Sequence, residues 1–214
     1  MLRNKVAIIS GASKDIRFSM VKVFSETHGA IGVVCSRDID SARMAMNQIN
    51  GNCTAEEVDV SNEISVIDLV KRIMNKYGKI DILINNAGFY FDKDTWYKRF
   101  HQITREELAS ALAVDLWGSF YMSIEVIKAS ITRVADGKGS EFTEPKNNCN
   151  RGAVIIKISS TPALEGYVVE SPYTIAKSAI LDLTKCIAKE YAKNNIRCYT
   201  LILGNIATMQ LLAL

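Results

Sequence analysis

Residues 5–17 read KVAIISGASKDIR, an apolar run that passes through a turn of small residues into a helix-forming segment. The apolar run, residues 5–10, predicts a short buried strand, and a helix is predicted from Ile16 onward. A strand that turns into a helix through small residues presents backbone N–H groups and the positive end of the helix dipole to a phosphate. This stretch therefore predicts the first strand–turn–helix unit of a parallel α/β sheet.

The same alternation continues along the chain. Further strand-like runs occupy residues 31–36, 54–60, 80–85, 153–159 and 196–203. Amphipathic stretches of helical length occupy residues 16–28, 39–50, 62–77, 105–133 and 173–193. This pattern implies parallel strands joined by right-handed crossovers, with helices on both faces of the sheet. We expect a three-layer, doubly wound Rossmann-type α/β fold whose six strands have the order 3-2-1-4-5-6.

No boundary between domains is evident. The 214 residues contain no internal repeat or low-complexity linker, so we expect one dinucleotide-binding domain over residues 1–214. Residues 134–152 are polar and show no periodicity. We interpret them as a solvated surface loop in preference to a partner-binding element.

Composition argues against several classes of protein. Apolar residues make up 48% of the chain and charged residues 23%, which is typical of a soluble domain with a sizeable core. The net charge of +3 is too small to indicate a nucleic-acid or anionic-membrane surface. No stretch approaches the roughly 18 consecutive apolar residues of a membrane-spanning helix. We expect a cytoplasmic protein with neither nucleic acid nor membrane as a partner.

Cysteine and histidine usage narrows the chemistry. The five cysteines are odd in number and form no C-x-x-C pair, which favours reduced thiols over a disulfide framework. The only histidines are His28 and His101, which argues against a histidine-based metal site and against a Ser/His/Asp hydrolase. No metal is expected.

The end of the second strand bears on the choice of nucleotide. An acidic residue there binds the ribose 2′-hydroxyl of NAD, but this chain has Ser36 and Arg37. Arg37, together with Lys14, is suited to the extra phosphate of NADP. We therefore expect NADP, or NADPH, as the cofactor in preference to NAD. The alternative is that both cations merely lie on the surface.

Tyr173 and Lys177 are spaced i and i+4, so they share one face of a predicted helix. A nearby ammonium favours the phenolate, and it would make Tyr173 a usable proton donor for a carbonyl near neutral pH. Such a pair also arises by chance in a chain rich in tyrosine and lysine. Its significance depends on the surrounding motifs.

Those motifs, in their order and spacing, resemble the short-chain dehydrogenase/reductase family, which includes the 3-oxoacyl-carrier-protein reductases. The resemblance extends over nearly the whole chain. The matching residues, in chain order, are Gly11, Asp59-Val60, Asn85-Asn86-Ala87-Gly88, Ile158-Ser159-Ser160, Tyr173 with Lys177, and Leu203-Gly204-Asn205-Ile206-Ala207-Thr208.

The resemblance implies an oxidoreductase that transfers a hydride between a nicotinamide cofactor and a ketone/alcohol substrate, a small or acyl-chain carbonyl compound. It implies that Ser160, rather than Ser159, orients the substrate carbonyl and that Tyr173 transfers the proton. Lys177 is implied to bind the nicotinamide ribose. It implies that the cofactor is bound by Gly11, Ser13, Lys14, Ile16, Ser36, Arg37, Asp59, Val60, Asn86, Ala87, Gly88, Tyr173, Lys177, Ile206 and Thr208.

The chain departs from the family pattern at two positions of the glycine turn, which have Asp15 and Arg17 in place of glycine. Glycine there allows the pyrophosphate and the sheet to approach the backbone closely, so we expect Arg17 to point away or to push the helix out. Asp15 is expected either to repel the phosphate or to bond the free N–H groups of the helix.

A third departure lies at the active-site asparagine of the family, where this chain has Asp115. An ionised carboxylate accepts hydrogen bonds but donates none. It is expected to weaken activity without excluding it, because it can still position a water or pair with Lys177. The departures leave a rival hypothesis, a catalytically impaired reductase-like scaffold or binding protein.

The last expectations concern the C-terminal end and assembly. The sequence stops at Leu214, whereas relatives continue with a substrate-covering segment, a helix and a seventh strand. We expect a C-terminally shortened domain in which the seventh strand is missing and the sixth is an exposed edge. The helices at 105–133 and 173–193 resemble the pair through which relatives dimerise, so we expect a homodimer or higher homo-oligomer.

Overall fold

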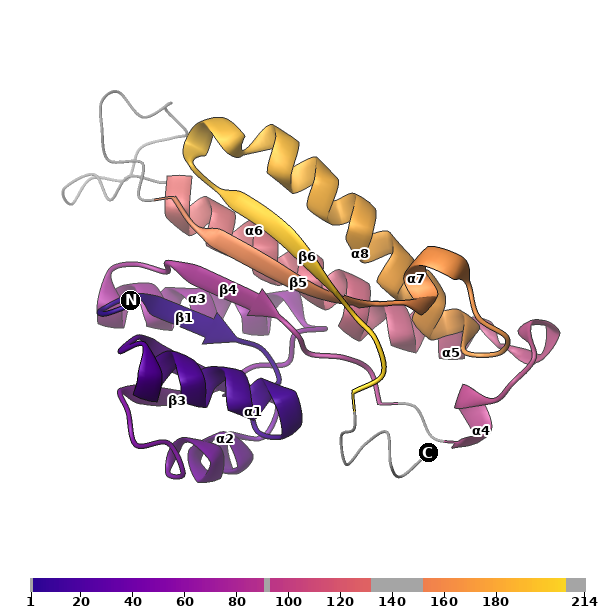
Figure 1. Cartoon of the computed structure of the whole chain (residues 1–214), viewed down its shortest axis with the longest axis horizontal. Coiled ribbons are helices and arrows are strands. Elements are labelled where there is room, and N and C mark those ends of the chain that lie inside the picture. Colours follow the sequence, from indigo (N-terminus) through magenta and orange to yellow (C-terminus); the bar gives the residue numbers. More distant parts are fainter. Residues whose placement is uncertain (1, 91–92, 132–151, 207–214) are drawn as a thin grey trace.

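One six-stranded parallel sheet organises the part of the chain that the structure, a computed structural model, describes, namely residues 2–90, 93–131 and 152–206. The strand order is β3-β2-β1-β4-β5-β6, as predicted (Figure 1). The strands are β1 (Val6–Ile9), β2 (Ile31–Ser36), β3 (Cys53–Glu57), β4 (Ile82–Asn85), β5 (Val154–Ser160) and β6 (Arg197–Leu203). Every neighbouring pair is parallel.

Helices cover both faces of this sheet, as predicted. The longer ones are α1 (Asp15–Lys22), α2 (Ile39–Met46), α3 (Glu63–Tyr77), α5 (Arg105–Leu112), α6 (Gly118–Ile131) and α8 (Ser171–Glu190). Wider π-helical turns extend α1 over Val23–Thr27 and join α5 to α6 over Ala113–Trp117. Short helical pieces are α4 (Lys93–Trp96), α7 (Pro162–Glu165), Phe100–Gln102 and Ala192–Asn194.

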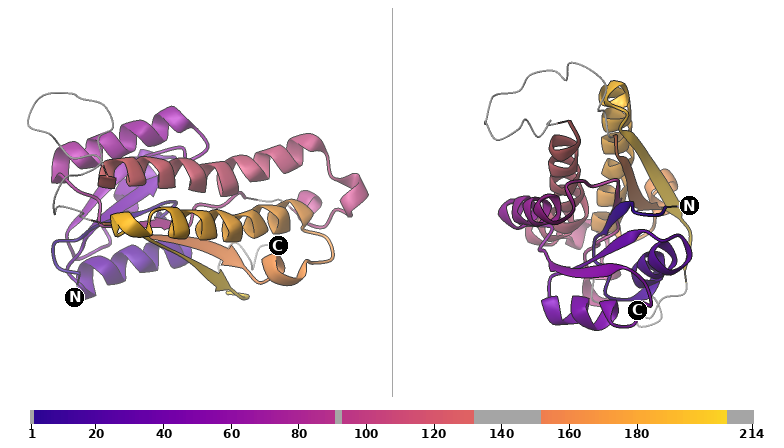
Figure 2. Two further views of the ribbon diagram at one scale, coloured as in Figure 1. Left: turned by 90° about the horizontal axis from the view of Figure 1, so that it is seen from above. Right: turned by 90° about the vertical axis from the view of Figure 1, so that its left-hand side faces the viewer.

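The core is divided between the two faces because side chains along a strand alternate in direction. On one face, Val6 and Ile8 of β1 belong to a buried cluster with residues of α3, α6 and α8. On the other face, Ala7 and Ile9 belong to a cluster with residues of α1 and α2. Figure 2 shows the sheet between these helices. All four residues of β1 are buried, as expected for the central strand of a two-sided sheet.

The structure differs from the sequence-based expectation mainly at element ends. The helix predicted over 39–50 ends at Met46, and the one predicted over 105–133 contains the π-helical turn. The pieces α4 and α7 are too short to show a periodic pattern, so they were not expected. The predicted loop at 134–152 lies outside the described residues except for Gly152. In the described segments, no helix has both the length and the apolar character that crossing a membrane requires.

Candidate active site

Two adjoining cavities lie at the carboxyl-end side of the strands, where β1 and β4 diverge into turns. The larger measures about 530 Å³ and the smaller about 300 Å³. Arg17, Gly88 and Phe89 line both. In doubly wound sheets, this is the crevice in which ligands bind, because the strand order reverses there and the loops part.

The larger cavity brings together the four residues that the sequence proposed for chemistry. It is lined by Asp115, Ser160, Tyr173 and Lys177. Ser160 is the last residue of β5, and Tyr173 and Lys177 lie in the first turns of α8. Tertiary structure thus makes one site out of residues from three separate elements.

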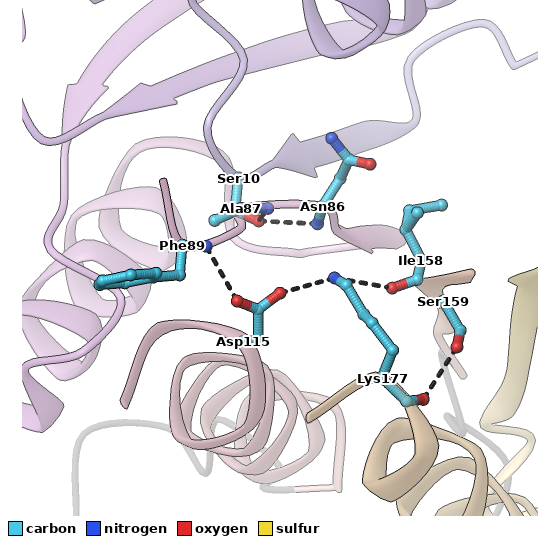
Figure 3. A network of polar contacts seen from close by, with 8 residues as sticks. All are labelled: Ser10, Asn86, Ala87, Phe89, Asp115, Ile158, Ser159 and Lys177. Carbon is cyan, nitrogen blue, oxygen red and sulfur yellow. Dashed lines mark hydrogen bonds and ion pairs between the residues drawn. The ribbon is translucent and has the colours of Figure 1, made fainter. Parts of the chain in front are cut away.

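Ser159 also lines this cavity, but its hydroxyl is engaged elsewhere. The side chain is 1% exposed, and its Oγ donates a hydrogen bond of 2.8 Å to the carbonyl oxygen of Lys177 (Figure 3). The bond ties the end of β5 to α8. Ser160, which is partly exposed, is therefore the serine better placed to meet a ligand.

Lys177 and Asp115 form a buried ion pair, with Nζ 2.6 Å from Oδ1 (Figure 3). The ammonium also donates to the carbonyl oxygen of Ile158 at 3.3 Å. Burial by itself would lower the pKa of Lys177, but the charge of Asp115, followed by that of Tyr173, outweighs burial and raises it. Lys177 is thus held as a cation beneath the cavity floor.

The other oxygen of Asp115 is also engaged. Oδ2 accepts a hydrogen bond of 2.9 Å from the backbone N–H of Phe89. Asp115 itself lies within the π-helical turn Ala113–Trp117. Such turns recur at functional sites because they redirect a side chain relative to a regular helix. Of the two outcomes expected for Asp115, the structure has the pairing with Lys177.

Tyr173 has two close neighbours at its ring. Lys177 Nζ lies 5.6 Å from the ring centroid, and the Trp96 ring lies 5.3 Å away, centroid to centroid. The backbone just before α8 is left-handed at Val169 (φ 65°) and Glu170 (φ 56°). Left-handed backbone at residues other than glycine costs free energy, and it clusters at functional sites. Here it precedes the turn that carries Tyr173.

The turns that follow β1 and β4 are joined by Ser10. Its Oγ accepts hydrogen bonds from the backbone N–H groups of Asn86, at 3.0 Å, and Ala87, at 2.9 Å (Figure 3). Gly11, at φ +67°, completes the contact, because a Cβ there would lie 3.2 Å from the Ala87 Cα. A residue larger than glycine would force these turns apart. The joined turns contribute to both cavities, because Asn86 lines the larger one and Gly11 and Ala87 line the smaller one.

The predicted cofactor residues divide between the two cavities. Ile16, Asn86 and Ile206 line the larger cavity along with Tyr173 and Lys177, and Gly88 lines both. The smaller cavity is lined by Gly11, Ser13, Lys14, Ser36, Arg37, Asp59, Val60 and Ala87. Thr208 lies outside the described residues. The two cavities adjoin, and together they reach from Arg37 in the smaller one to Tyr173 in the larger one. An extended ligand such as a dinucleotide fits this arrangement.

Arg17 corrects one expectation. Its guanidinium does not point away from the site: the side chain lines both cavities, and its Nη1 lies 3.2 Å from the position of a Cβ on Gly11. Burial lowers the pKa of Arg17, and the charges of Asp15 and Asp115 oppose that effect. The helix is not displaced from the sheet either, because Val21 of α1 is fully buried. A long side chain at this position turns into the crevice because its tip finds space there.

Asp15 begins α1 with a left-handed backbone, φ 55°. This conformation explains why glycine suits the position. Within the described residues, no hydrogen bond joins the Asp15 carboxylate to the first N–H groups of α1. Of the two alternatives expected for Asp15, hydrogen bonding to the free N–H groups of the helix is therefore wrong.

Several cavity-lining residues were not found from the sequence. The larger cavity is lined by Phe89, Trp96, Tyr97, Tyr167 and Glu170 in addition to the predicted set. Burial raises the pKa of Glu170, and a hydrogen bond from Trp96 opposes that shift. No local pattern distinguishes these residues from other aromatic or acidic loop residues. Phe89 directly follows the turn after β4, and the packing of α4 and of the segment before α8 brings the others to the cavity.

Comparison with known proteins bears on the identity of this fold and site. A family model described as short chain dehydrogenase matches residues 5–212. The 3-oxoacyl-[acyl-carrier-protein] reductase FabG of Chlamydia muridarum is 30% identical over 212 residues, which cover 97% of this chain and 76% of that protein. The 3-hydroxyacyl-CoA dehydrogenase type-2 of Rattus norvegicus is 28% identical over 208 residues, covering 97% and 75% respectively.

A solved structure agrees with these matches. The 3-ketoacyl-(acyl-carrier-protein) reductase from Brucella melitensis, complexed with NADH, superposes with a TM-score of 0.84 at 27% identity. The alignment covers 100% of this chain and 80% of that chain.

Proposed function

The chain belongs to the short-chain dehydrogenase/reductase family of oxidoreductases, and from this premise we propose that it is an NADP(H)-dependent reductase or dehydrogenase of a ketone/alcohol pair. The observation that carries the proposal is the convergence of Ser160, Tyr173 and Lys177 on one cavity next to a second, cation-lined one. A proton donor, a carbonyl-orienting hydroxyl and a fixed cation are what carbonyl reduction requires of a protein.

In the proposed reaction, the Ser160 hydroxyl donates a hydrogen bond to the substrate carbonyl oxygen, and Tyr173 transfers its phenolic proton to that oxygen. A bound nicotinamide cofactor would supply the hydride, or accept it in the reverse direction. Lys177 places its ammonium 5.6 Å from the Tyr173 ring centroid, near the group that gives up its proton. Asp115 keeps that ammonium charged and in place, with its Oδ1 2.6 Å from Nζ.

The proposed preference for NADP rests on the smaller cavity. Lys14 and Arg37 both line it, and Ser36 stands where an acidic residue would bind the ribose of NAD. The Brucella melitensis relative was solved with NADH, so the preference is proposed for this chain from its own cations.

The substrate is proposed to be a small-molecule carbonyl or acyl compound. Trp96, Tyr97 and Tyr167 give the larger cavity an aromatic wall, which favours an apolar body attached to the reacting carbonyl.

A second candidate function is a binding or scaffold protein that has lost catalysis. Two observations favour it. Lys177 Nζ is already paired with Asp115, and Arg17 lies between the two cavities. If these contacts persisted, they would hold the ammonium away from a ribose and leave less room for the cofactor.

Thermal unfolding with NADPH and with NADH tests the proposal, because a ligand that binds only the native state raises its melting temperature. We expect a larger rise with NADPH. Arg37→Asp should reverse the preference, whereas Arg43→Asp, an equal charge change on exposed α2, should preserve it. Equal stabilisation by both cofactors would contradict the NADP assignment.

Turnover separates the enzyme from the scaffold. Reduction of a panel of aromatic and acyl ketones should be measurable with the wild type and lost in Tyr173→Phe, which keeps the ring but removes the proton donor. Cofactor binding without turnover on any ketone would favour the scaffold.

A further inference from the structure

Arg17 occupies a position that the proposed reaction does not use. It lies in the first turn of α1, and it is one of three residues that line both cavities. Its guanidinium reaches back over the turn after β1, with Nη1 3.2 Å from the place of a Cβ on Gly11. In this fold the pyrophosphate of a dinucleotide binds at that turn, against the start of the first helix.

The guanidinium has unused hydrogen-bonding capacity there. Within residues 2–90, 93–131 and 152–206, no hydrogen bond or ion pair within 4.0 Å engages Arg17. The side chain is partly buried, and burial lowers its pKa, with the more distant charges of Asp15 and Asp115 opposing the shift. A partly buried cation with five N–H donors and no close anion among the described residues favours a ligand that brings negative oxygens to it.

Resting on the proposed function, we propose that the Arg17 guanidinium binds the pyrophosphate of the dinucleotide and replaces the close backbone contact that glycine provides in relatives. The side chain lies where the two cavities meet, so its donors face the middle of an extended ligand rather than either end.

This role accounts for the two unusual residues of the turn together. Asp15 places a carboxylate near the site of a doubly charged ligand, which by itself opposes binding. Arg17 is close enough to Asp15 and Asp115 for their charges to act on it, and it offsets them. The inference reverses the sequence-based expectation for Arg17, because removing this arginine should weaken the binding of the cofactor.

The test is the affinity of the full chain for ADP, which carries the pyrophosphate on the ribose 5′-oxygen, and for 2′-AMP, which carries a single phosphate on the ribose 2′-oxygen and no pyrophosphate. Calorimetric titrations would compare the wild type with Arg17→Met, which keeps the length of the side chain without its charge. Arg17→Lys keeps the charge without the planar fork. Lys22→Met removes an equal charge from the last turn of α1, where the side chain is exposed and lines neither cavity.

We expect Arg17→Met to lose roughly tenfold to a hundredfold in ADP affinity, the range of one or two charge-assisted hydrogen bonds. Arg17→Lys should lose less. The affinity for 2′-AMP in Arg17→Met, and for ADP in Lys22→Met, should change by less than about threefold, because screening weakens distant charges.

Four results would overturn the inference. Unchanged or tighter ADP binding in Arg17→Met would mean that the side chain obstructs the site. An equal loss of affinity for 2′-AMP would mean that Arg17 attracts any anionic ligand by its charge alone and does not bind the pyrophosphate directly. If the wild type bound neither ADP nor NADPH, the proposed function would fail as well, whereas intact NADPH binding in Arg17→Met would refute only the role of Arg17.

Discussion

Asp115 accepts contacts at both carboxylate oxygens, one from the Phe89 N–H and one from the Lys177 ammonium. The asparagine that the family resemblance leads one to expect carries no charge, so it would offer the Lys177 ammonium no ionic partner. The substitution therefore supplies a buried charge that pairs with Lys177, in addition to its expected effect on activity. Because the pair is buried, removing either charge would leave the other uncompensated.

Two properties of Asp15, its backbone conformation and its charge, predict the effects of replacing it by glycine. Asp15→Gly removes a side chain from a left-handed position, φ 55°, so the free energy of unfolding should rise by up to about 1 kcal/mol. It also removes a carboxylate from the phosphate site. At about 5 Å and an effective dielectric near 20 the repulsion is about 3 kcal/mol, up to about a hundredfold in NADPH affinity.

Urea denaturation and fluorescence titration at low and high salt would measure these two effects. The gain in affinity should shrink as salt screens the charge. An affinity that is unchanged at low salt would show that the carboxylate does not face the bound phosphates.

Lys157 is an ionisable group inside the core. Its side chain is 0% exposed, and Nζ donates to the hydroxyls of Ser119, at 2.9 Å, and Ser123, at 2.5 Å. Burial lowers its pKa to about 8, an effect that a negative charge on Cys198 would oppose. Since the pKa of lysine in an unfolded chain is about 10.4, the unfolded state binds more protons than the folded state between about pH 8 and 10.

The stability of the wild type should therefore gain from Lys157 as pH rises through this window, by at most roughly 3 kcal/mol. Lys157→Met should lack this gain. Its advantage over the wild type in free energy of unfolding should be largest below pH 8, where the wild type must bury a charged ammonium. Denaturation curves at pH 7 and pH 9.5 would compare them. The exposed variant Lys185→Met should behave like the wild type, and parallel pH profiles for all three would contradict the assignment.

Among the elements, α6 is placed by its first residue. Gly118 begins the helix directly after the π-helical turn that carries Asp115. A Cβ on Gly118 would lie 2.7 Å from Val60 Cγ2, and Val60 lines the smaller cavity. The close approach of α6 to the segment after β3 thus affects the position of Asp115 and the lining of the smaller cavity at once.

Gly118→Ala should therefore lower the free energy of unfolding by roughly 1–3 kcal/mol, even though alanine favours helices, because Val60 must move. The matched variant Gly204→Ala, where nothing lies within 4 Å of the added methyl group, should be close to neutral. Chemical denaturation would measure both. Equal stability of the two variants would show that Val60 yields without cost.

At the scale of the whole molecule, an aromatic group at the start of α6 suggests how copies of the chain associate. Trp117 packs against Phe120 and Tyr121, with ring centroids 5.6 and 6.1 Å away, and is nevertheless 47% exposed. The helices expected to form a homodimer are those of residues 105–133 and 173–193, so this group adjoins the predicted interface. Aromatic residues with one exposed face are typical anchors of protein interfaces.

We predict a homodimer at tens of micromolar, with Trp117→Glu shifting the mass measured by light scattering to that of a monomer. Leu164→Glu introduces the same charge at an exposed apolar residue of α7, outside these helices, and should leave the mass unchanged. A monomeric wild type would contradict the prediction.

Most of the fold follows from local pattern. Short β-branched runs and 3.6-residue periodicity each depend on neighbours in sequence, so strand order and helix placement could be inferred together with right-handed connectivity. The pairing of Tyr173 with Lys177 on one helix face could be inferred for the same reason. Because the strands are parallel, the turns after β1, β4 and β5 share one edge of the sheet.

Tertiary structure decided where individual side chains go. Lys157, in an otherwise apolar strand, would be expected at the surface, yet it is fully buried. Arg17 turns into the crevice, Asp115 pairs with Lys177, and Trp96 packs on Tyr173. Each outcome depends on the surface of another element that is distant in the sequence. Periodicity shows which face of an element is covered. The partner of a side chain, however, is set by how elements that are distant in the sequence pack together.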